Sequence, residues 1–472
     1  MKKNIIMISI IAAIAGSLLL IQLNNSETTD DSVATSSIKN KIDQQINQAI
    51  YYTIPDATTP SVVIDDTSGR IYAAYFKSEN EGGNLYVVSS DDGGKTFSEP
   101  VRVNHVKDSV VINAQWSAPG MGVGQNGEVH LVWYDADYSE PDKFPWGKVT
   151  LQYARSLDGA NTFEPARNPS PDDPEGEQSY PFITISEDNS VHISYLNLDY
   201  SKEKDNSGTP TVLRVVSSMD GGQTFEKSVI SDHSACQCCA TVITMGPDNE
   251  VYVSSRSTFL NTVQSLSDDM RTDYHGTHND KIIIRDITVS HSVDNGMAQV
   301  FTEPVKVGKD DWFMNGCPDA GPGMAFDDKE RLHIAWFTGS DDAINGQGFY
   351  YAYSNDGGNS YSTPIPIKLL SEKWIPPTTQ YLVTDNNNNA WIVFVNSEGL
   401  KKSPTYDEDY TYIGDGSIHL AIVGSDGNLI RNEALVQGDI TKHYPFTSSS
   451  GDKIAISWME GDDVKITIFD TA

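Results

Sequence analysis

The sequence has little positive charge and lacks several motifs that would define a function. Lys and Arg total 33 residues against 65 Asp and Glu, which gives a formal net charge of −32. A chain this acidic would be repelled by nucleic acid and by anionic lipid, so neither is expected as a partner. There is no support for a phosphate-binding loop, a dinucleotide fingerprint, a serine triad or a calcium-binding loop. The acidity is typical of an exported protein kept soluble by its charge.

Long hydrophobic runs are absent after the first 23 residues. Lys2 and Lys3 precede an uncharged apolar run over residues 5–23, which a polar stretch follows. Nineteen residues is long for a cleaved signal and sufficient to span a bilayer. We therefore predict a signal peptide or a retained N-terminal membrane anchor over 1–23, a polar linker over 24–47 and a folded domain over 48–472. The positive flank predicts an extracytoplasmic domain, secreted or anchored to the membrane only through this segment.

A short turn recurs six times in the remainder of the chain. Its clearest copies are residues 90–97 and 218–225, whereas residues 156–163 carry Ala160 in place of Gly and residues 354–361 end in Tyr. Asp and Ser side chains bond back to the backbone in such turns, and Gly supplies a left-handed residue. Successive key aspartates are separated by 62 to 74 residues, and they are Asp92, Asp158, Asp220, Asp294, Asp356 and Asp426. This period predicts a stacked or radial repeat architecture.

The pattern S-x-D-x-G-x-T-[FWY] resembles the Asp-box (BNR) repeats of the sialidase-like β-propeller superfamily. The resemblance covers roughly residues 50–472 and implies an all-β propeller. It says little about activity, because the box is a structural turn and one fold hosts many functions.

The hairpin count predicts seven blades. Seven hairpins have second strands at 71–76, 130–134, 191–196, 251–255, 332–337, 391–395 and 454–458. The seventh module has three strands, and residues 49–54 precede the first hairpin without a partner. A closed ring results if this N-terminal strand completes the last blade. A seven-bladed propeller closed in this way is the predicted fold, with the six-bladed sialidase type as the alternative.

The four cysteines lie in two short motifs. Cys236, Cys238 and Cys239 directly precede the predicted inner strand at 240–245, and Cys317 precedes the inner strand at 323–326. Because inner strands of neighbouring blades start side by side, the two motifs are expected to meet at the mouth of the central channel. Thiolates are ligands for soft metals, so we predict a copper site, with zinc as the runner-up. The alternatives are structural disulfides without a cofactor, or a redox-active dithiol.

Other residues are expected at the same rim. An insertion at 258–280 in module four carries His275 and His278, which are predicted metal ligands together with His443 of module seven. Equivalent positions of other modules supply further candidates for the channel mouth, namely Trp116, Glu177, Tyr180, Trp374 and Tyr444. An aromatic wall of this kind would restrict water access to a bound metal.

The resemblance also implies a competing function, exo-sialidase-type glycoside hydrolysis. Such enzymes hold a substrate carboxylate with three arginines from different blades, and they use a tyrosine with a glutamate, and an aspartate as acid/base. Tyr180 with Glu177, and Asp56, are the candidates for the last three roles. The first arginine is missing, because its Arg-Ile-Pro motif reads Thr-Ile-Pro at 53–55. The remaining candidates all fall in module four: Arg256, Arg271 and Arg285.

We therefore predict that the chain is not a conventional sialidase. If it is an enzyme, the two options are a metal-dependent redox protein and a sialidase-like glycoside hydrolase. A purely structural or ligand-binding propeller is the third reading. In each case a small molecule, metal or glycan is the expected ligand at the channel mouth.

Overall fold

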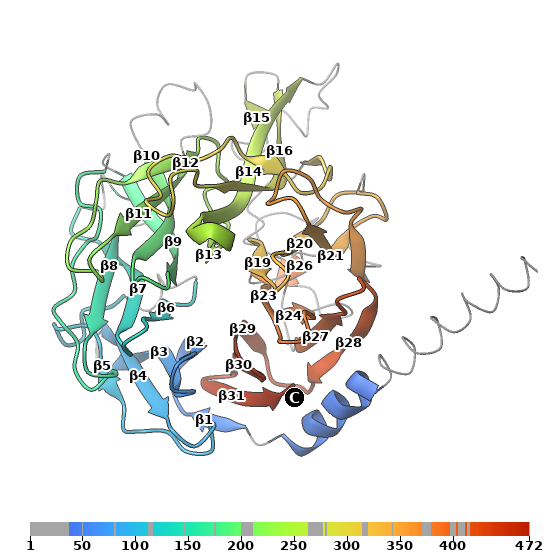
Figure 1. Cartoon of the computed structure of the whole chain (residues 1–472). Helices are drawn as coiled ribbons and strands as arrows, with labels where there is room; N and C mark the ends of the chain where they lie inside the picture. Colours follow the sequence, from blue (N-terminus) through green and yellow to red (C-terminus); the bar gives the residue numbers. More distant parts are fainter. Residues whose placement is uncertain are drawn as a thin grey trace, which may run out of the picture.

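The fold is a seven-bladed β-propeller, in which seven sheets surround a central axis (Figure 1). The computed structural model of the chain describes residues 37–49, 51–79, 82–111, 117–140, 142, 144, 147–173, 176–199, 211–262, 277–278, 281–313, 320–341, 343–370, 379–396, 403–404, 411–412 and 416–471. The predicted signal or anchor at 1–23 and most of the insertion at 258–280 lie outside these residues. No helix in the described ranges is long and apolar enough to cross a membrane.

Each blade is an antiparallel sheet that follows the chain from its inner to its outer strand. Blades one to three comprise β2 (Thr58–Ile64), β3 (Ile71–Glu79), β4 (Gly82–Ser90) and β5 (Val101–Arg102); β6 (Gly120–Val123), β7 (Val129–Asp137) and β8 (Lys148–Ser156); and β9 (Gly176–Ile185), β10 (Val191–Asp199), β11 (Thr211–Ser218) and β12 (Val229–Asp232). Blade four comprises β13 (Val242–Met245), β14 (Val251–Thr262), β16 (Lys281–His291) and β17 (Val305–Lys306), with the short β15 (Thr277–His278) and β18 (Trp312–Phe313) also paired to β16. A single 3₁₀ turn, Pro247–Asn249, joins β13 to β14.

The remaining blades have four strands each. Blade five comprises β19 (Gly323–Phe326), β20 (Leu332–Thr338), β21 (Gly348–Ser354) and β22 (Ile365–Leu369); blade six comprises β23 (Tyr381–Thr384), β24 (Ala390–Asn396), β27 (Ser417–Val423) and β28 (Leu429–Val436); blade seven comprises β29 (Lys442–Ser450), β30 (Lys453–Glu460), β31 (Asp463–Asp470) and β1 (Tyr52–Ile54). A separate ribbon pairs β25 (Ser403–Pro404) with β26 (Thr411–Tyr412). All seven predicted second strands fall within β3, β7, β10, β14, β20, β24 and β30.

The ring closes through the N-terminal strand. Strand β1 pairs antiparallel with β31, with Tyr52 opposite Ile466 and Ile54 opposite Val464. The first described strand is therefore the outer strand of the last blade, and it covers the edge that β31 would otherwise expose. This pairing confirms the predicted closure, and the count of seven sheets excludes the six-bladed alternative.

The repeated turn has the same hydrogen bonds in four blades. In blade three, the hydroxyls of Ser218 and Thr224 donate to the two carboxylate oxygens of Asp220 at 2.7 and 2.6 Å. The turns at 90–97, 156–163 and 354–361 repeat both bonds. Gly222 adopts a φ of 76°, and Ala160 occupies the equivalent position with a φ of 66°. The turn geometry therefore persists in blade two although the residue there has a Cβ.

A helix precedes the first strand. Residues 37–48 are helical and lie beside β28 (Figure 1), and residues 37–47 belong to the segment expected to be a polar linker. Isoleucines at 38, 42 and 46 follow the spacing of one helix face, and Ile42 is buried in a cluster with Trp391 and Trp458. Two ion pairs, Lys39 with Glu433 and Asp43 with Arg431, fix the polar side of the helix to blade six.

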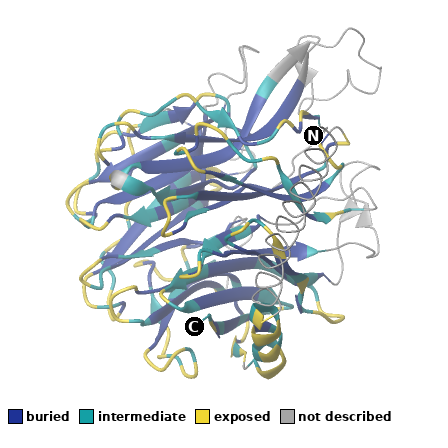
Figure 2. Ribbon diagram, turned by 45° about the vertical axis from the view of Figure 1, so that its right-hand side comes forward, coloured by how far each residue is buried: buried dark blue, intermediate teal, exposed yellow. Residues whose placement is uncertain are grey.

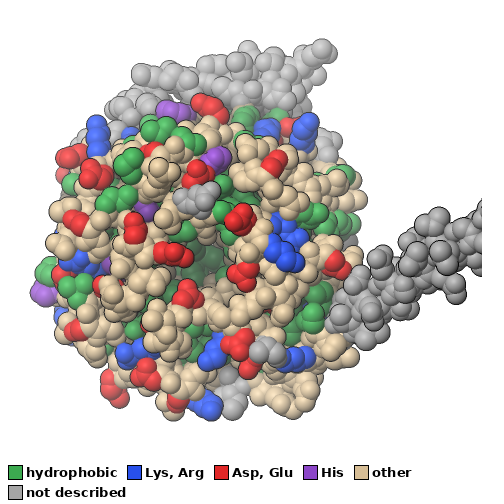
Figure 3. All heavy atoms as spheres, viewed as in Figure 1, with side chains coloured by type: hydrophobic (Ala, Val, Ile, Leu, Met, Phe, Trp, Pro, Cys, Tyr) green, Lys and Arg blue, Asp and Glu red, His purple; other side chains and the backbone are tan. Residues whose placement is uncertain are grey.

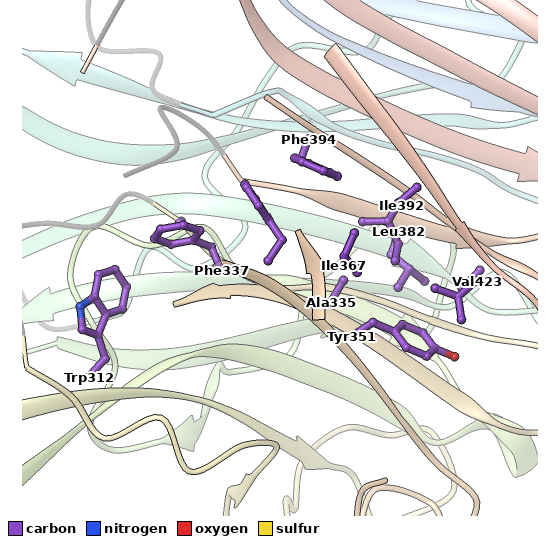
Figure 4. Close-up of a cluster of buried hydrophobic side chains, with 13 residues drawn as sticks. Trp312, Ala335, Phe337, Tyr351, Ile367, Leu382, Ile392, Phe394 and Val423 are labelled. Carbon is purple, nitrogen blue, oxygen red and sulfur yellow. The ribbon is translucent and has the colours of Figure 1, made fainter. Parts of the chain in front are cut away.

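The hydrophobic core lies between the blades. Buried residues occupy the strands, whereas exposed residues gather in the turns (Figure 2). Figure 4 shows one such cluster, in which Trp312 and Phe337 lie at one end and Val423 at the other. Similar clusters fill the other interfaces, so each blade is stabilised chiefly by burying apolar side chains against its two neighbours.

Aromatic rings narrow the central channel. Phe182 of blade three, Tyr381 of blade six and Phe446 of blade seven have ring centroids 4.5 to 6.1 Å apart. One face of the molecule is hollowed at its centre, and hydrophobic side chains lie at the bottom of the hollow (Figure 3). The axis of the propeller is therefore packed by side chains from non-neighbouring blades.

Candidate metal centre

The first cysteine motif forms the connection between blades three and four. It leaves the outer strand β12 and enters the inner strand β13. Because neighbouring strands are antiparallel, this connection lies on the face opposite the repeated turns, which join third to fourth strands. The amide of Cys236 donates to the Arg256 carbonyl at 2.7 Å, and the amide of Thr258 donates to the Ser234 carbonyl at 2.6 Å. These bonds fold the motif over the end of β14.

Three sulfur atoms gather at this connection. The Sγ atoms of Cys236, Cys238 and Cys239 all lie within 4.8 Å of one another. Cys236 Sγ is 3.7 Å from Cys238 Sγ and 3.5 Å from Cys239 Sγ. A tetrahedral zinc ion with Zn–S bonds of about 2.3 Å holds its sulfurs roughly 3.8 Å apart. The two distances from Cys236 are therefore close to those between thiolates bound to one metal ion.

The cluster is largely removed from solvent. Cys236 and Cys239 have 4% and 0% of their surface exposed, whereas Cys238 is half-buried. Cys238 is disulfide-bonded, whereas Cys236 and Cys239 are thiols. The fourth cysteine of the sequence, Cys317, lies outside the described residues. A three-sulfur metal site therefore requires the reduced form of Cys238, which is also the most accessible of the three.

Cys236 is in an environment that favours the thiolate. Its pKa is lowered from 9.0 to about 5, chiefly by the hydrogen bond from the Cys239 thiol and then by the positive charges of Arg285 and Arg256, while burial opposes the shift. Thiolates, not thiols, bind metals. The local charges therefore suit metal coordination at neutral pH.

Blade five approaches this connection closely. A Cβ built on Gly321 would lie 2.0 Å from the Ala240 carbonyl oxygen, so the two backbones are in direct contact. Ala240 follows Cys239, and Gly321 lies four residues after Cys317. Residues that flank the two motifs are therefore in contact, whereas Cys317 itself lies outside the described part of the chain.

Two of the arginine candidates, Arg256 and Arg285, are buried, and Arg271 lies outside the described residues. The Arg256 side chain is fully buried, and it donates to the carbonyls of Ala320 and Phe337 on the next blade. Arg285 is 5% exposed and lies on the neighbouring strand β16. Arg256 is therefore held away from any carboxylate at the channel mouth.

Two tyrosine candidates occupy strained positions on inner strands. Tyr180 and Tyr444 have φ values of 52° and 47°, and each lies where the pairing register shifts. The Tyr180 carbonyl accepts a hydrogen bond from the Thr241 hydroxyl at 3.0 Å, which connects it to the strand after the cysteines. Strained residues of this kind often cluster at functional sites.

The remaining candidates are scattered. Asp56 is exposed with a φ of 53°, and the Glu177 carbonyl accepts from the Asn197 side chain at 3.2 Å. Burial lowers the pKa of His443 to about 4, so its imidazole is neutral at pH 7, but it is not part of the three-cysteine group. His278 belongs to β15, and the other candidates lie outside the described residues, namely Trp116, Arg271, His275 and Trp374.

Three inner strands share a second repeated feature, which the sequence analysis did not predict: a bulge at a residue that precedes proline. Thr59, Tyr180 and Tyr444 each precede a proline, have positive φ and sit at a register shift in the inner strands β2, β9 and β29. A proline near the start of an inner strand could have indicated this bulge, because proline interrupts strand pairing and is found at bulges. The anchoring of Arg256 had no comparable signal.

Comparison with known proteins supports the fold. No protein-family model matches the chain, and no curated protein matches it. Among solved structures, a polysaccharide lyase of family PL25, an ulvan lyase bound to -[GlcA(1-4)Rha3S]-, has 12% sequence identity and a TM-score of 0.54 over 90% of this chain and 96% of that chain.

Two further structures have lower TM-scores. A Hadza microbial sialidase is 11% identical, with a TM-score of 0.44 over 83% of this chain and 74% of that chain. An α-L-arabinofuranosidase from Fusarium graminearum is 13% identical, with a TM-score of 0.47 over 80% of this chain and 98% of that chain. At these identities, the likeness to the solved structures concerns the fold alone.

Proposed function

We propose that this chain is an exported β-propeller that binds a soft metal ion through the cysteine connection between blades three and four. The observation that carries the proposal is the convergence of three Sγ atoms within 4.8 Å of one another. Three thiolates are soft ligands, which favour copper(I) or zinc over magnesium and calcium. Export, inferred from the N-terminal apolar run, places this site outside the cytoplasmic membrane.

Charge balance favours copper(I) if these three thiolates alone bind the metal. Three thiolates and the two buried guanidinium groups of Arg256 and Arg285 sum to a charge of minus one, which one monovalent cation neutralises. A buried site close to neutrality avoids the large cost of an uncompensated charge. If the thiolate of Cys317 joins as a fourth ligand, the same argument favours divalent zinc. Metal identity and ligand number are therefore linked.

Cys317 is within reach of the cluster by chain length. Gly321 contacts Ala240, and four residues of extended chain span at most about 14 Å. Cys238 is disulfide-bonded, whereas Cys236 and Cys239 are thiols. Outside the cytoplasm the same sulfurs can therefore carry a disulfide or a metal, and the two states exclude each other at Cys238.

Elemental analysis combined with thiol counting tests the proposal. Full-length protein is purified without added metal, reduced under anaerobic conditions, and supplied with copper(I) or zinc before gel filtration. We expect about one metal per chain and thiols that a thiol reagent no longer reaches. The triple variant Cys236→Ser, Cys238→Ser, Cys239→Ser is the control, since it keeps the acidic surface and its weak non-specific binding. Equal metal content in the two reduced proteins would overturn the proposal.

A glycan ligand at the channel mouth is the second candidate. It is favoured by the strained residues Tyr180 and Tyr444, which lie on the inner strands, and by a fold shared with an ulvan lyase. A conventional sialidase activity is not expected, because the Arg-Ile-Pro arginine is absent and Arg256 is buried. Release of fluorophore from a sialoside, abolished by Tyr180→Phe, would contradict this expectation.

A further inference from the structure

We propose that Arg256 is a positioning residue that clamps the cysteine connection to blade five and so pre-forms the metal site. The inference rests on the proposed metal-binding function for its purpose, but the clamp itself can be tested without metal. It assigns to Arg256 a role in assembling a metal centre in place of substrate binding.

The backbone of Arg256 holds the first cysteine motif. Its carbonyl accepts the Cys236 amide at 2.7 Å, and the flanking residues Ala235 and Ser257 form an isolated β-bridge. The position of Cys236 is therefore set by the backbone of β14 at this one residue.

The side chain of Arg256 holds the segment that follows the second motif. Its Nε and Nη2 donate to the Ala320 carbonyl at 3.2 and 3.0 Å, and Nη2 also donates to the Phe337 carbonyl at 2.6 Å. Ala320 lies three residues after Cys317. Arg256 thus joins the first cysteine motif to blade five, through its main chain on one side and its side chain on the other.

The clamp is rigid and desolvated. The guanidinium carbon lies 4.8 Å from the ring centroid of Trp312, and the side chain has no exposed surface. Stacking on an aromatic face and a fork of fixed N–H groups restrict the guanidinium to one orientation. The lysine ammonium lacks this planar fork, so lysine cannot reproduce the geometry.

The clamp has one N–H group that its bonds to the two carbonyls do not use. Within the described part of the chain, Arg256 Nη1 is buried without a hydrogen-bond acceptor. Leaving a buried charged donor unpaired is costly, so such groups usually mark a missing partner. Arg256 is hydrogen-bonded to Cys236 through its main-chain carbonyl. A metal-bound thiolate at the cluster would be an acceptor of matching charge, as outer-shell donors to metal ligands commonly are.

Variants of Arg256 and of a second buried arginine separate this role from general stability. Arg256→Met keeps much of the apolar stem and removes the fork, and Arg256→Lys keeps the charge. Arg431→Met is the matched control, because Arg431 is 3% exposed and donates to three carbonyls of blade six at 2.8 to 3.2 Å. All variants are full-length and are studied in urea concentrations well below their unfolding transitions.

The first measurement uses reduced, metal-free protein. The alkylation rates of Cys236 and Cys239 are followed by mass spectrometry of their shared peptide. We expect Arg256→Met and Arg256→Lys to raise the rate at least about tenfold, because the cover over these buried thiols opens more often. Arg431→Met should alkylate at the wild-type rate, even with an equal loss of global stability. Wild-type rates in both Arg256 variants would overturn the clamp.

The second measurement is competition for copper(I) or zinc with a chelator. We expect both Arg256 variants to bind about 10- to 100-fold more weakly, the range typical of lost outer-shell contacts, and Arg431→Met to bind as wild type does. If the wild-type protein does not bind the metal, the proposed function is wrong. The clamp would still be tested, because the alkylation rates are measured without metal. Unchanged affinity in both Arg256 variants would overturn its link to the metal site. If Arg256→Met does not fold, Arg256→Lys decides both measurements.

Discussion

The contact between Gly321 and Ala240 makes a sharp prediction about the metal centre. In Gly321→Ala, the new methyl group would lie 2.0 Å from the Ala240 carbonyl oxygen and 2.8 Å from its carbonyl carbon. Both are backbone atoms and cannot rotate away. Ordinary contact therefore requires the two backbones to move about 1.4 Å further apart. Ala240 is adjacent to Cys239, so this displacement is transmitted to the sulfur cluster.

The neighbouring bonds prevent blade four from absorbing this movement easily. The hydroxyl of Thr241, next to Ala240, is within 2.8 Å of the Ser194 hydroxyl and donates to the Tyr180 carbonyl. Overpacking of this kind typically costs about 1–3 kcal/mol of unfolding free energy. Metal–ligand distances tolerate only about 0.2 Å, so a displacement several times larger should also weaken metal binding by at least tenfold.

Urea unfolding of the reduced apo protein and chelator competition measure the two effects. Gly323→Ala is the control, because its methyl would meet blade six, 2.9 Å from the Leu382 amide nitrogen. We expect both variants to lose stability and Gly321→Ala alone to lose metal affinity. If Gly321→Ala binds metal as wild type does, the contact does not position the cluster, and the geometric basis of the site is wrong.

The arrangement of the blades could be predicted from sequence because its determinants are local. Alternating strands, polar turns and the Asp-containing turn repeat along the chain, and each can be recognised within about ten residues. Closure by the N-terminal strand could be predicted because the seventh module has only three strands, so its fourth strand has to come from elsewhere in the chain. The pairing of Tyr52 with Ile466 satisfies that edge.

The helix at 37–48 could not be placed in the same way. Its isoleucines at 38, 42 and 46 have helical spacing, but the segment is otherwise polar and short for an isolated helix. Its stability comes from burial of Ile42 beside Trp458 and from the ion pair between Asp43 and Arg431, all of which depend on distant parts of the chain. The segment was accordingly interpreted as a linker.

The cysteine cluster could be predicted in part. Equivalent positions in neighbouring repeats indicated convergence, but the sequence cannot specify sulfur distances or the oxidation state of Cys238. Both depend on how the connection folds over β14. The role of Arg256 was also hidden, because its partners are main-chain carbonyls of the next blade, and any residue type supplies a carbonyl. Side-chain chemistry in the sequence does not reveal such an anchor.

Three further predictions concern stability and are measured by urea unfolding or proteolysis. Gly222→Ala should lower the free energy of unfolding by roughly 2–4 kcal/mol, because strain at a φ of 76° adds to a contact of 1.8 Å between the new methyl and the Tyr153 hydroxyl. Gly93→Ala has a φ of 75° and no atom within 4 Å, so it should cost about 1 kcal/mol. Equal losses in the two variants would show that the contact is relieved without cost. Ile42→Ala should weaken the docking of residues 37–48 by about 2 kcal/mol and so make them sensitive to protease, while the blades unfold at the wild-type urea concentration. Joint unfolding of the helix and the blades would contradict local docking. The last prediction concerns pH. Burial lowers the pKa of His192 to about 4, so between that value and the unfolded pKa of about 6.5 the unfolded chain binds a proton that the native protein does not. Native stability therefore falls as the pH drops through this window, by about 2 kcal/mol at pH 5 from this residue alone, and is constant above it. In His192→Asn the unfolding free energy should be lower than wild type at pH 7.5, and the gap should narrow by about that amount at pH 5. Comparing the two proteins cancels the contributions of titrating groups that do not interact with His192, so parallel curves would show that the pKa of His192 is the same in the native and unfolded states.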